Sequence, residues 1–223
     1  MPITAQQVVD RAWIKAHDRG ATKRWGADEA LLWINDGRRE VVTWVPRANT
    51  KSAVVTPAGG TRQTLAGLGL SDGLQFVDIP RNMAADGVTS GSAMTPAKRQ
   101  WLDERKRAWH ADLAAEATHF CTSDEDPTAC YLWPAKSAGK IEVIYSAAPV
   151  ELTDLSQAIG LADIYANALQ LYVLHCFHSK DSEHQKGMQQ AQNYYAMFLQ
   201  LLGVRTQNTR AVQAAADAKA SGA

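Results

Sequence analysis

Cysteine, charge imbalance and long apolar runs are all scarce in this sequence. Its 223 residues include three cysteines, and 23 basic residues balance 23 acidic ones, so the formal net charge is zero. The low cysteine count argues against a disulfide-stabilised scaffold, and the charge balance argues against attraction of nucleic acid through bulk charge. The longest apolar stretch lies around residues 169–177 and is too short to cross a bilayer. We therefore expect no membrane partner.

The N-terminus lacks the pattern of a secretory signal. It reads MPITAQQVVDRAW, with no basic flank followed by an apolar run. Hydrophobic residues make up 46% of the chain and charged residues 21%, which is typical of a folded globular protein. We expect a protein made in the cytosol, with one domain and a terminal appendage.

Motifs of common enzymes are also missing. The chain contains no G-x-S-x-G, no H-E-x-x-H and no phosphate-binding loop. His175 and His178, in the stretch HCFH, are one helical turn apart and could share a metal ion at that spacing. The sequence supplies no further ligand there, because Cys176 points about 100° away on a helix. We interpret HCFH as a place where two helices pack, and we expect no metal, no cofactor and no catalytic residue.

Hydrophobic periodicity predicts an α+β chain that is mainly α. Residues 1–203 are expected to form one domain, a helical bundle with an inserted β-meander. The predicted helices cover about residues 3–18, 27–45, 161–178 and 181–202, and the β-rich insertion covers about 50–150, with strand patterns at 118–123, 129–134 and 140–147. Thr4 and Gln7 have the spacing of a helix-capping pair, and Pro46 follows the last turn of the second predicted helix.

The C-terminal residues 204–223 differ from the rest of the chain. They are rich in alanine, contain almost no large apolar side chain, and carry Arg205, Arg210 and Lys219 against Asp217. Such a segment buries too little apolar surface to fold alone, although alanine-rich sequence readily becomes helical on a partner. We expect a flexible C-terminal extension that binds another protein.

One internal segment combines tryptophan with basic residues. The stretch KRQWLDERKRAWH places Trp101 and Trp109 among Arg105, Arg107 and other cations. Aromatic and basic residues together suit single-stranded nucleic acid, but Trp and Arg are also the usual anchors of protein interfaces. Seven tryptophans in a chain without a visible active site indicate an interaction protein.

The order of these segments resembles the head-to-tail adaptor (connector) proteins of tailed bacteriophages, especially short-tailed ones. The resemblance covers nearly the whole chain, from ITAQQVVDRAW and LLWINDGRREVV through LQFVDIPRNM to the C-terminal helix pair. Its most specific parts are EVIYSAAP and the helix pair that begins IYANALQLYVL and ends FLQLLG.

This resemblance implies a structural virion protein at the head-to-tail interface, made in the host cytoplasm. Such adaptors form a ring, usually twelve-fold, that joins the portal protein to the tail nozzle protein. Genomic DNA passes through the lumen without sequence-specific binding. A C-terminal extension commonly docks on the portal, which implies that role for Val204, Arg205, Arg210, Val212 and Lys219. Trp101, Arg105, Arg107 and Trp109 are then expected to contact a neighbouring subunit or the tail.

Two alternatives of other classes remain open at this point. Some phage connectors have been suspected of cell-wall hydrolysis, which needs two carboxylates across a cleft. Nominal candidates for such a pair are Glu116, Asp124 and Glu125. The other alternative is a small helical regulatory protein that binds one partner through its C-terminal extension.

Overall fold

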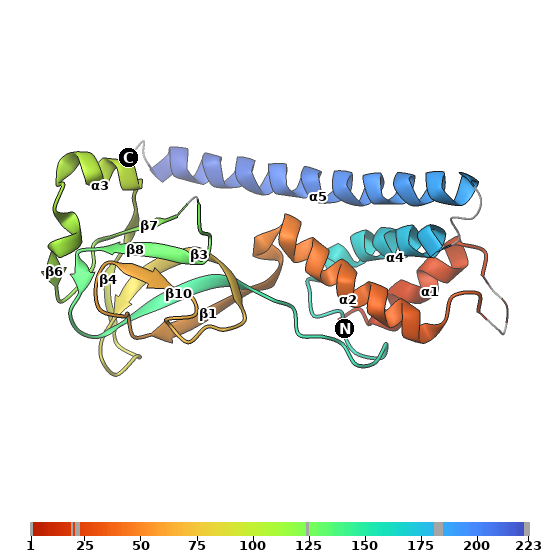
Figure 1. Cartoon of the computed structure of the whole chain (residues 1–223), viewed down its shortest axis with the longest axis horizontal. Helices are drawn as coiled ribbons and strands as arrows, with labels where there is room; N and C mark the ends of the chain where they lie inside the picture. The colour runs from red at the N-terminus through yellow and green to blue at the C-terminus, as the bar shows by residue number, and fades with distance from the viewer. Residues whose placement is uncertain (1, 19, 21–22, 124, 181–184, 221–223) are drawn as a thin grey trace. The chain divides into compact units, whose positions relative to one another are not determined.

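The chain has an α+β fold that divides into two compact units. The computed structural model describes residues 2–18, 20, 23–123, 125–180 and 185–220, with no side-chain description for residue 185 or for 204–220. One unit contains residues 1–48 and 149–223 and is helical; the other is Asn49–Ala148 and holds the β-strands. We call them the helical unit and the β unit (Figure 1). The sequence predicts a β-rich insertion at about residues 50–150, the region that the β unit occupies.

The helical unit is built around one central helix. Its helices are α1 (Ala5–Lys15), α2 (Ala27–Trp44), the short 3-10 helix η3 (Asp163–Tyr165), α4 (Ala166–Lys180) and α5 (Gln185–Ala220). Helix α4 packs against α1, α2 and α5 (Figure 1), so it is apolar on nearly all sides. Gly37 of α2 permits this packing, because a Cβ atom there would lie 2.9 Å from the ring of Tyr172 on α4.

Local signals set several helix ends as predicted. The Thr4 hydroxyl accepts a hydrogen bond from the Gln7 N–H, and the Gln7 side chain accepts one from the Thr4 N–H, which forms a capping box at the start of α1. Helix α2 ends at Trp44, and Pro46 opens the 3-10 helix η1 (Pro46–Asn49). Both observations confirm the predicted signals.

The last helix differs from its prediction. Residues 181–184, at its predicted start, lie outside the described residues. Helix α5 does not stop near residue 202 but continues through Gly203 to Ala220. The predicted flexible extension is therefore helical over residues 204–220, in keeping with the high helix propensity of its many alanines.

The β unit contains two four-stranded sheets and a two-stranded pair. One sheet has the order β1-β10-β3-β4, the second has the order β2-β8-β7-β5, and β6 pairs with β9. The strands are β1 (Thr50–Val55), β2 (Arg62–Thr64), β3 (Gly73–Met83), β4 (Ser90–Ala93), β5 (Thr95–Pro96), β6 (Leu113–Ala114), β7 (His119–Thr122), β8 (Ala129–Trp133), β9 (Ala135–Lys136) and β10 (Lys140–Ala147). Helix α3 (Arg99–Arg105) and the 3-10 helix η2 (Trp109–Ala111) follow β5.

The three predicted strand segments exist as β7, β8 and β10, but the predicted β-meander is wrong. Strands β7 and β8 form an antiparallel hairpin, whereas β10 pairs with β1 and β3 in the other sheet. The chain leaves the hairpin after Trp133, and Ala135–Lys136 pairs in parallel with Leu113–Ala114. This detour carries β10 away from β8, so sequence order does not give spatial order.

Candidate interaction surface

Helix α3 and the turn after it are attached to the β unit by two buried side chains. Leu102 is 1% exposed and Trp109 is fully buried, and both pack with Cys121 of β7. The Trp109 indole N–H donates a hydrogen bond of 2.8 Å to the Asp103 carboxylate. Trp109 is therefore a core residue, and the predicted contact role does not suit its buried side chain.

Trp101 lies on α3 as well, but its side chain is 40% exposed. The indole packs against the imidazole of His119, with ring centroids 5.4 Å apart, and edge-on against Trp133 at 6.4 Å. The Arg105 guanidinium lies 5.3 Å from the centre of the Trp101 ring, a cation–π distance. Trp101 is thus held in one orientation while much of its surface stays accessible.

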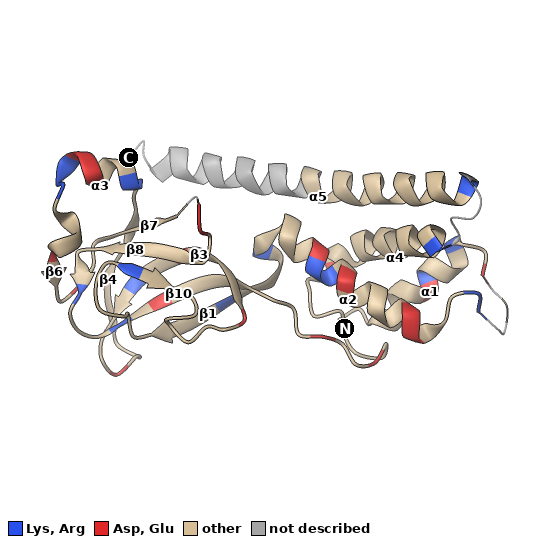
Figure 2. Cartoon of the chain, in the orientation of Figure 1, with Lys and Arg blue, Asp and Glu red and all other residues tan. Residues whose placement is uncertain are grey.

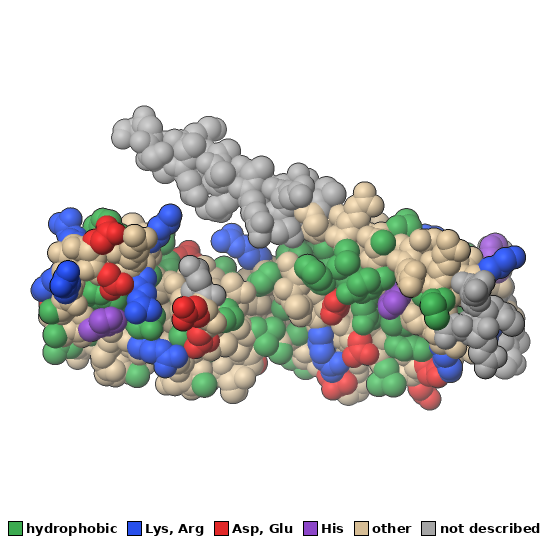
Figure 3. All heavy atoms as spheres, turned by 45° about the horizontal axis from the view of Figure 1, so that its top comes forward, with side chains coloured by type: hydrophobic (Ala, Val, Ile, Leu, Met, Phe, Trp, Pro, Cys, Tyr) green, Lys and Arg blue, Asp and Glu red, His purple; other side chains and the backbone are tan. Residues whose placement is uncertain are grey.

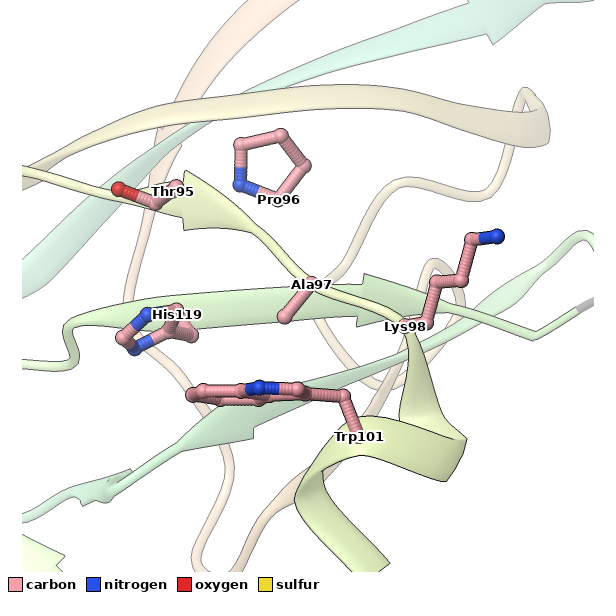
Figure 4. Close-up of a pocket in the computed structure, with 6 residues that line it drawn as sticks. All are labelled: Thr95, Pro96, Ala97, Lys98, Trp101 and His119. Carbon is pink, nitrogen blue, oxygen red and sulfur yellow. The ribbon is translucent and has the colours of Figure 1, made fainter. Parts of the chain in front are cut away.

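A pocket of about 350 Å³ opens beside Trp101. Figure 4 shows the indole below Ala97 and His119, with Lys98 extending from the rim. The residues that line it come from β5, the start of α3 and β7: Thr95, Pro96, Ala97, Lys98, Trp101 and His119. No local pattern in the sequence predicts that Thr95, Pro96 and His119 lie together, because these residues meet only through the parallel pairing of β5 with β7.

Lys98 is the basic residue that lines this pocket, and the basic residues that follow it in the chain form ion pairs to different degrees. Figure 2 shows basic positions at both ends of α3 with acidic positions between them. The Arg99 guanidinium lies 3.7 Å from the Asp103 carboxylate. Lys106 forms a 2.5 Å ion pair with Asp112 just after η2, and this contact, with a hydrogen bond from the Trp133 indole, lowers the pKa of Asp112. Arg107 has no ion pair with any residue that the structure describes.

The predicted portal-binding residues lie on the last part of α5. Val204, Arg205, Arg210, Val212 and Lys219 all fall within the helical range Gln185–Ala220, but their side chains lie outside the described part of the chain. Their role stays a prediction.

The contacts of HCFH confirm its interpretation as a helix interface. The His175 ring nitrogen lies 3.0 Å from the Ala191 carbonyl oxygen on α5, and His178 stacks on Tyr194 with ring centroids 5.4 Å apart. Burial raises the pKa of the Cys176 thiol to about 12, so it is protonated at neutral pH and a poor nucleophile. Within the described residues, no three His, Cys, Asp or Glu side chains lie close enough together to hold a metal ion.

Of the carboxylates considered for hydrolysis, Glu116 has a pKa shift that does not suit a general acid. The exposed Glu116 accepts a hydrogen bond from the Ser92 N–H, and Ser92 lowers the pKa of Glu116. A general acid of a glycosidase requires the opposite shift. Asp124 lies outside the described residues, and Glu125 is exposed in the same β7–β8 turn.

Two further observations bear on the class of protein. None of the helices among the described residues has the length and apolar character needed to cross a membrane. Large apolar side chains are exposed on both units, including Ile14, Leu32, Trp44, Leu113 and Met197. Exposed apolar surface of this kind is common where proteins assemble.

Comparison with known proteins agrees with this picture of an assembly component. No curated protein shows a significant match to the chain. The model of one protein family, described as SU10 adaptor protein, matches residues 3–220, which is nearly the whole chain and includes both units. The chain therefore belongs to the SU10 adaptor protein family, in agreement with its resemblance to phage head-to-tail adaptors.

Proposed function

We propose that this protein forms a ring that joins the portal to the tail nozzle of a tailed phage and leaves a channel for DNA. The match of the SU10 adaptor family over residues 3–220 is the observation that carries the proposal. The protein is then a component of the virion, made in the host cytoplasm, with a structural rather than an enzymatic role. Its formal net charge of zero suits a channel that lets DNA pass without binding it tightly.

A ring of identical chains, proposed as a dodecamer, requires heterologous contacts in which two different faces of each subunit meet. The helical unit exposes apolar side chains on separate elements: Ile14 on α1, Leu32 and Trp44 on α2, and Met188 and Met197 on α5. Figure 3 shows hydrophobic side chains among polar ones on the visible face of this unit. We assign the ring contacts to α1 and α2 of one subunit and to the α4–α5 pair of the next.

The C-terminal part of α5 is the proposed portal-binding element. Helix α5 has 36 residues and α4 has 15, which correspond to about 54 Å and about 22 Å of helix. The antiparallel partner α4 is therefore too short to cover the whole of α5. We assign portal docking to residues 204–223, with Val204, Arg205, Arg210, Val212 and Lys219, whose positive excess suits an acidic surface.

Mass measurement tests the assembly directly. We expect native mass spectrometry of the full chain, alone and mixed with the portal ring of its virus, to show a many-copy ring on the portal. Deletion of residues 204–223 should reduce the helical circular dichroism signal only by the share of the removed helix, leave the remaining protein folded, and abolish portal binding. The matched control is Arg47→Glu, which reverses one exposed charge on η1, outside the helices assigned to the ring contacts, and should bind normally. A full chain that stays monomeric or dimeric beside the portal would support a regulatory protein instead.

A further inference from the structure

The pocket beside Trp101 combines an apolar interior with a basic rim. Pro96, Ala97 and the Trp101 indole supply carbon surface, and the volume of about 350 Å³ lies within the range of small-ligand pockets. In Figure 4 the Lys98 side chain extends from the rim, and its ammonium group points away from the indole. The interior therefore suits an apolar group, and the rim suits an anion.

The charge around this pocket is local. Residues 98–107, KRQWLDERKR, contain five basic and two acidic side chains, an excess of three positive charges in a chain whose formal net charge is zero. The carboxylates of Asp103 and Asp112 engage Arg99 and Lys106. Arg107 is exposed and forms no ion pair with the described residues. Such a surface attracts a partner of opposite charge.

A partner is not expected to bind beside the pocket by pairing as an extra strand with β5. Strand β5 is the last strand of its sheet, and the N–H groups of Thr95 and Ala97 donate to the β7 side, to the carbonyls of Thr118 and Phe120. Pro96 lies between them and has no N–H, so the outer edge of β5 lacks a donor there. Recognition by a side chain that enters the pocket therefore fits this site better than strand addition.

The acidic residues of α3 favour a peptide over a nucleic acid. Asp103 and Glu104 are exposed among the basic residues of the segment. A nucleic acid carries a phosphate at every nucleotide and cannot avoid these two carboxylates, whereas a peptide can place its acidic residues opposite the cations alone. An aromatic side chain gains most from the Trp101 face, through ring packing.

We infer that the pocket binds one aromatic side chain of an acidic segment of a partner protein. Trp101 and Pro96 contact the aromatic ring, and Lys98 at the rim and Arg105 beside the Trp101 ring attract the flanking carboxylates. The inference rests on the proposed function only in that it names the chemistry of a partner for one contact surface of the adaptor. Peptide binding is measured without the portal, so its failure and the failure of ring assembly are separate results.

Fluorescence polarisation of labelled peptides on the full chain tests the inference. The probe is a short peptide with one central tryptophan flanked by Asp and Glu. Comparison probes replace the tryptophan by alanine or the acids by their amides, and a mixed-sequence single-stranded DNA is the fourth probe. We expect the acidic tryptophan peptide to bind about tenfold more tightly than either altered peptide, and its affinity to fall with added salt.

Three variants locate the site. Trp101→Ala and Lys98→Glu should each weaken binding of the acidic tryptophan peptide by about tenfold. Trp44→Ala is the matched control, an exposed tryptophan (51%) in the helical unit, and it should change binding by less than about twofold. Circular dichroism checks the fold of Trp101→Ala; if this variant is unfolded, the Lys98→Glu variant decides, because Lys98 is exposed and lines the pocket.

Three results would overturn the inference. The first is a wild-type protein that does not bind the acidic tryptophan peptide, or binds its alanine version equally well. The second is single-stranded DNA that binds more tightly than the peptide, which would assign the surface to nucleic acid. The third is full affinity in a folded Trp101→Ala or Lys98→Glu variant.

Discussion

The helical unit and the β unit each use one buried asparagine to hold a distant stretch of backbone. In the helical unit, the Asn35 side chain donates to the Leu152 carbonyl and accepts from the Leu152 N–H, both at 2.9 Å. In the β unit, the Asn82 side chain donates to the Ala117 carbonyl at 2.7 Å and accepts from the Ala117 N–H at 3.1 Å. Leu152 and Ala117 lie outside helices and strands, so the amide side chain supplies the pairing that regular structure does not.

The two asparagines differ in where their cationic neighbour comes from. The Asn35 carbonyl accepts from Arg38, three residues later on the same helix, at 3.0 Å. The Asn82 carbonyl accepts from Lys136 of β9, 54 residues away, at 3.2 Å. Burial lowers the pKa of both cations. The comparison shows that the cation of such a polar cluster can come from helix spacing within one element or from a residue far away in the chain.

The largest expected effects come from the aromatic core residue of each unit. Phe177 is fully buried and stacks on Trp25 with ring centroids 4.5 Å apart, and Trp109 is fully buried in the β unit. We expect Phe177→Ala and Trp109→Ala each to lower the free energy of unfolding by about 3–5 kcal/mol. Urea denaturation followed by circular dichroism measures the change.

Trp44→Ala provides the control for both core variants. Its side chain is half exposed, so we expect a loss below about 1 kcal/mol. Equal losses for Trp109→Ala and Trp44→Ala would contradict the assignment of Trp109 to the core.

Substitution of either buried asparagine should have the second-largest effect on stability. Asn35→Ala or Asn82→Ala leaves a buried N–H and a buried carbonyl without their partner, which we expect to cost about 2–4 kcal/mol in each case. Hydrogen exchange followed by mass spectrometry should show lost protection around residue 152 in the first variant and around residue 117 in the second.

Asn193→Ala, on the exposed side of α5, should change stability by less than about 0.5 kcal/mol. Loss of protection at residue 152 in Asn82→Ala would show that the two asparagine contacts are not local to their own units.

Low pH should destabilise the β unit more than the helical unit, and this effect should be smaller than those of the substitutions above. Hydrogen bonds and nearby cations lower the pKa of Asp72, Asp86, Asp112, Glu116 and Asp126 in the β unit. In the helical unit, the described carboxyls with a lowered pKa are Glu29 and Asp154. A carboxyl with a lowered pKa stabilises the fold above its ordinary pKa, and this contribution disappears as the pH falls through its folded pKa. The β unit should therefore lose stability more steeply in acid.

Asp86 offers the clearest single test of this difference. Its carboxylate accepts hydrogen bonds from the Thr89 hydroxyl and from the N–H groups of Val88 and Thr89, which lower its pKa to about 2. Asp86→Ala should be less stable than wild type at pH 7, and the two should converge as the pH falls from about 4 to about 2. Urea denaturation at a series of pH values measures this, and a difference that persists at the acid end would contradict the mechanism.

Much of the local structure could be predicted from the sequence. The capping pair Thr4 and Gln7, the stop at Pro46 and the strands β7, β8 and β10 depend on signals that act within a few residues. The α+β class and the adaptor resemblance also follow from the order of the segments, and the family match over residues 3–220 confirms the resemblance. The end of α5 was not predicted, because glycine at position 203 is only a weak stop within sequence that otherwise favours helix.

Only the tertiary structure decided how these elements meet. Trp101 and Trp109 lie in one charged segment, and no local pattern in the sequence distinguishes them. Trp109 nevertheless packs with Cys121 in the core, whereas Trp101 is exposed beside the pocket. Strand β10 likewise carries no local mark of its partners, and it pairs with β1 and β3 rather than with β8. Burial and strand pairing depend on residues far away in the chain, because they are set by which apolar surfaces can cover one another.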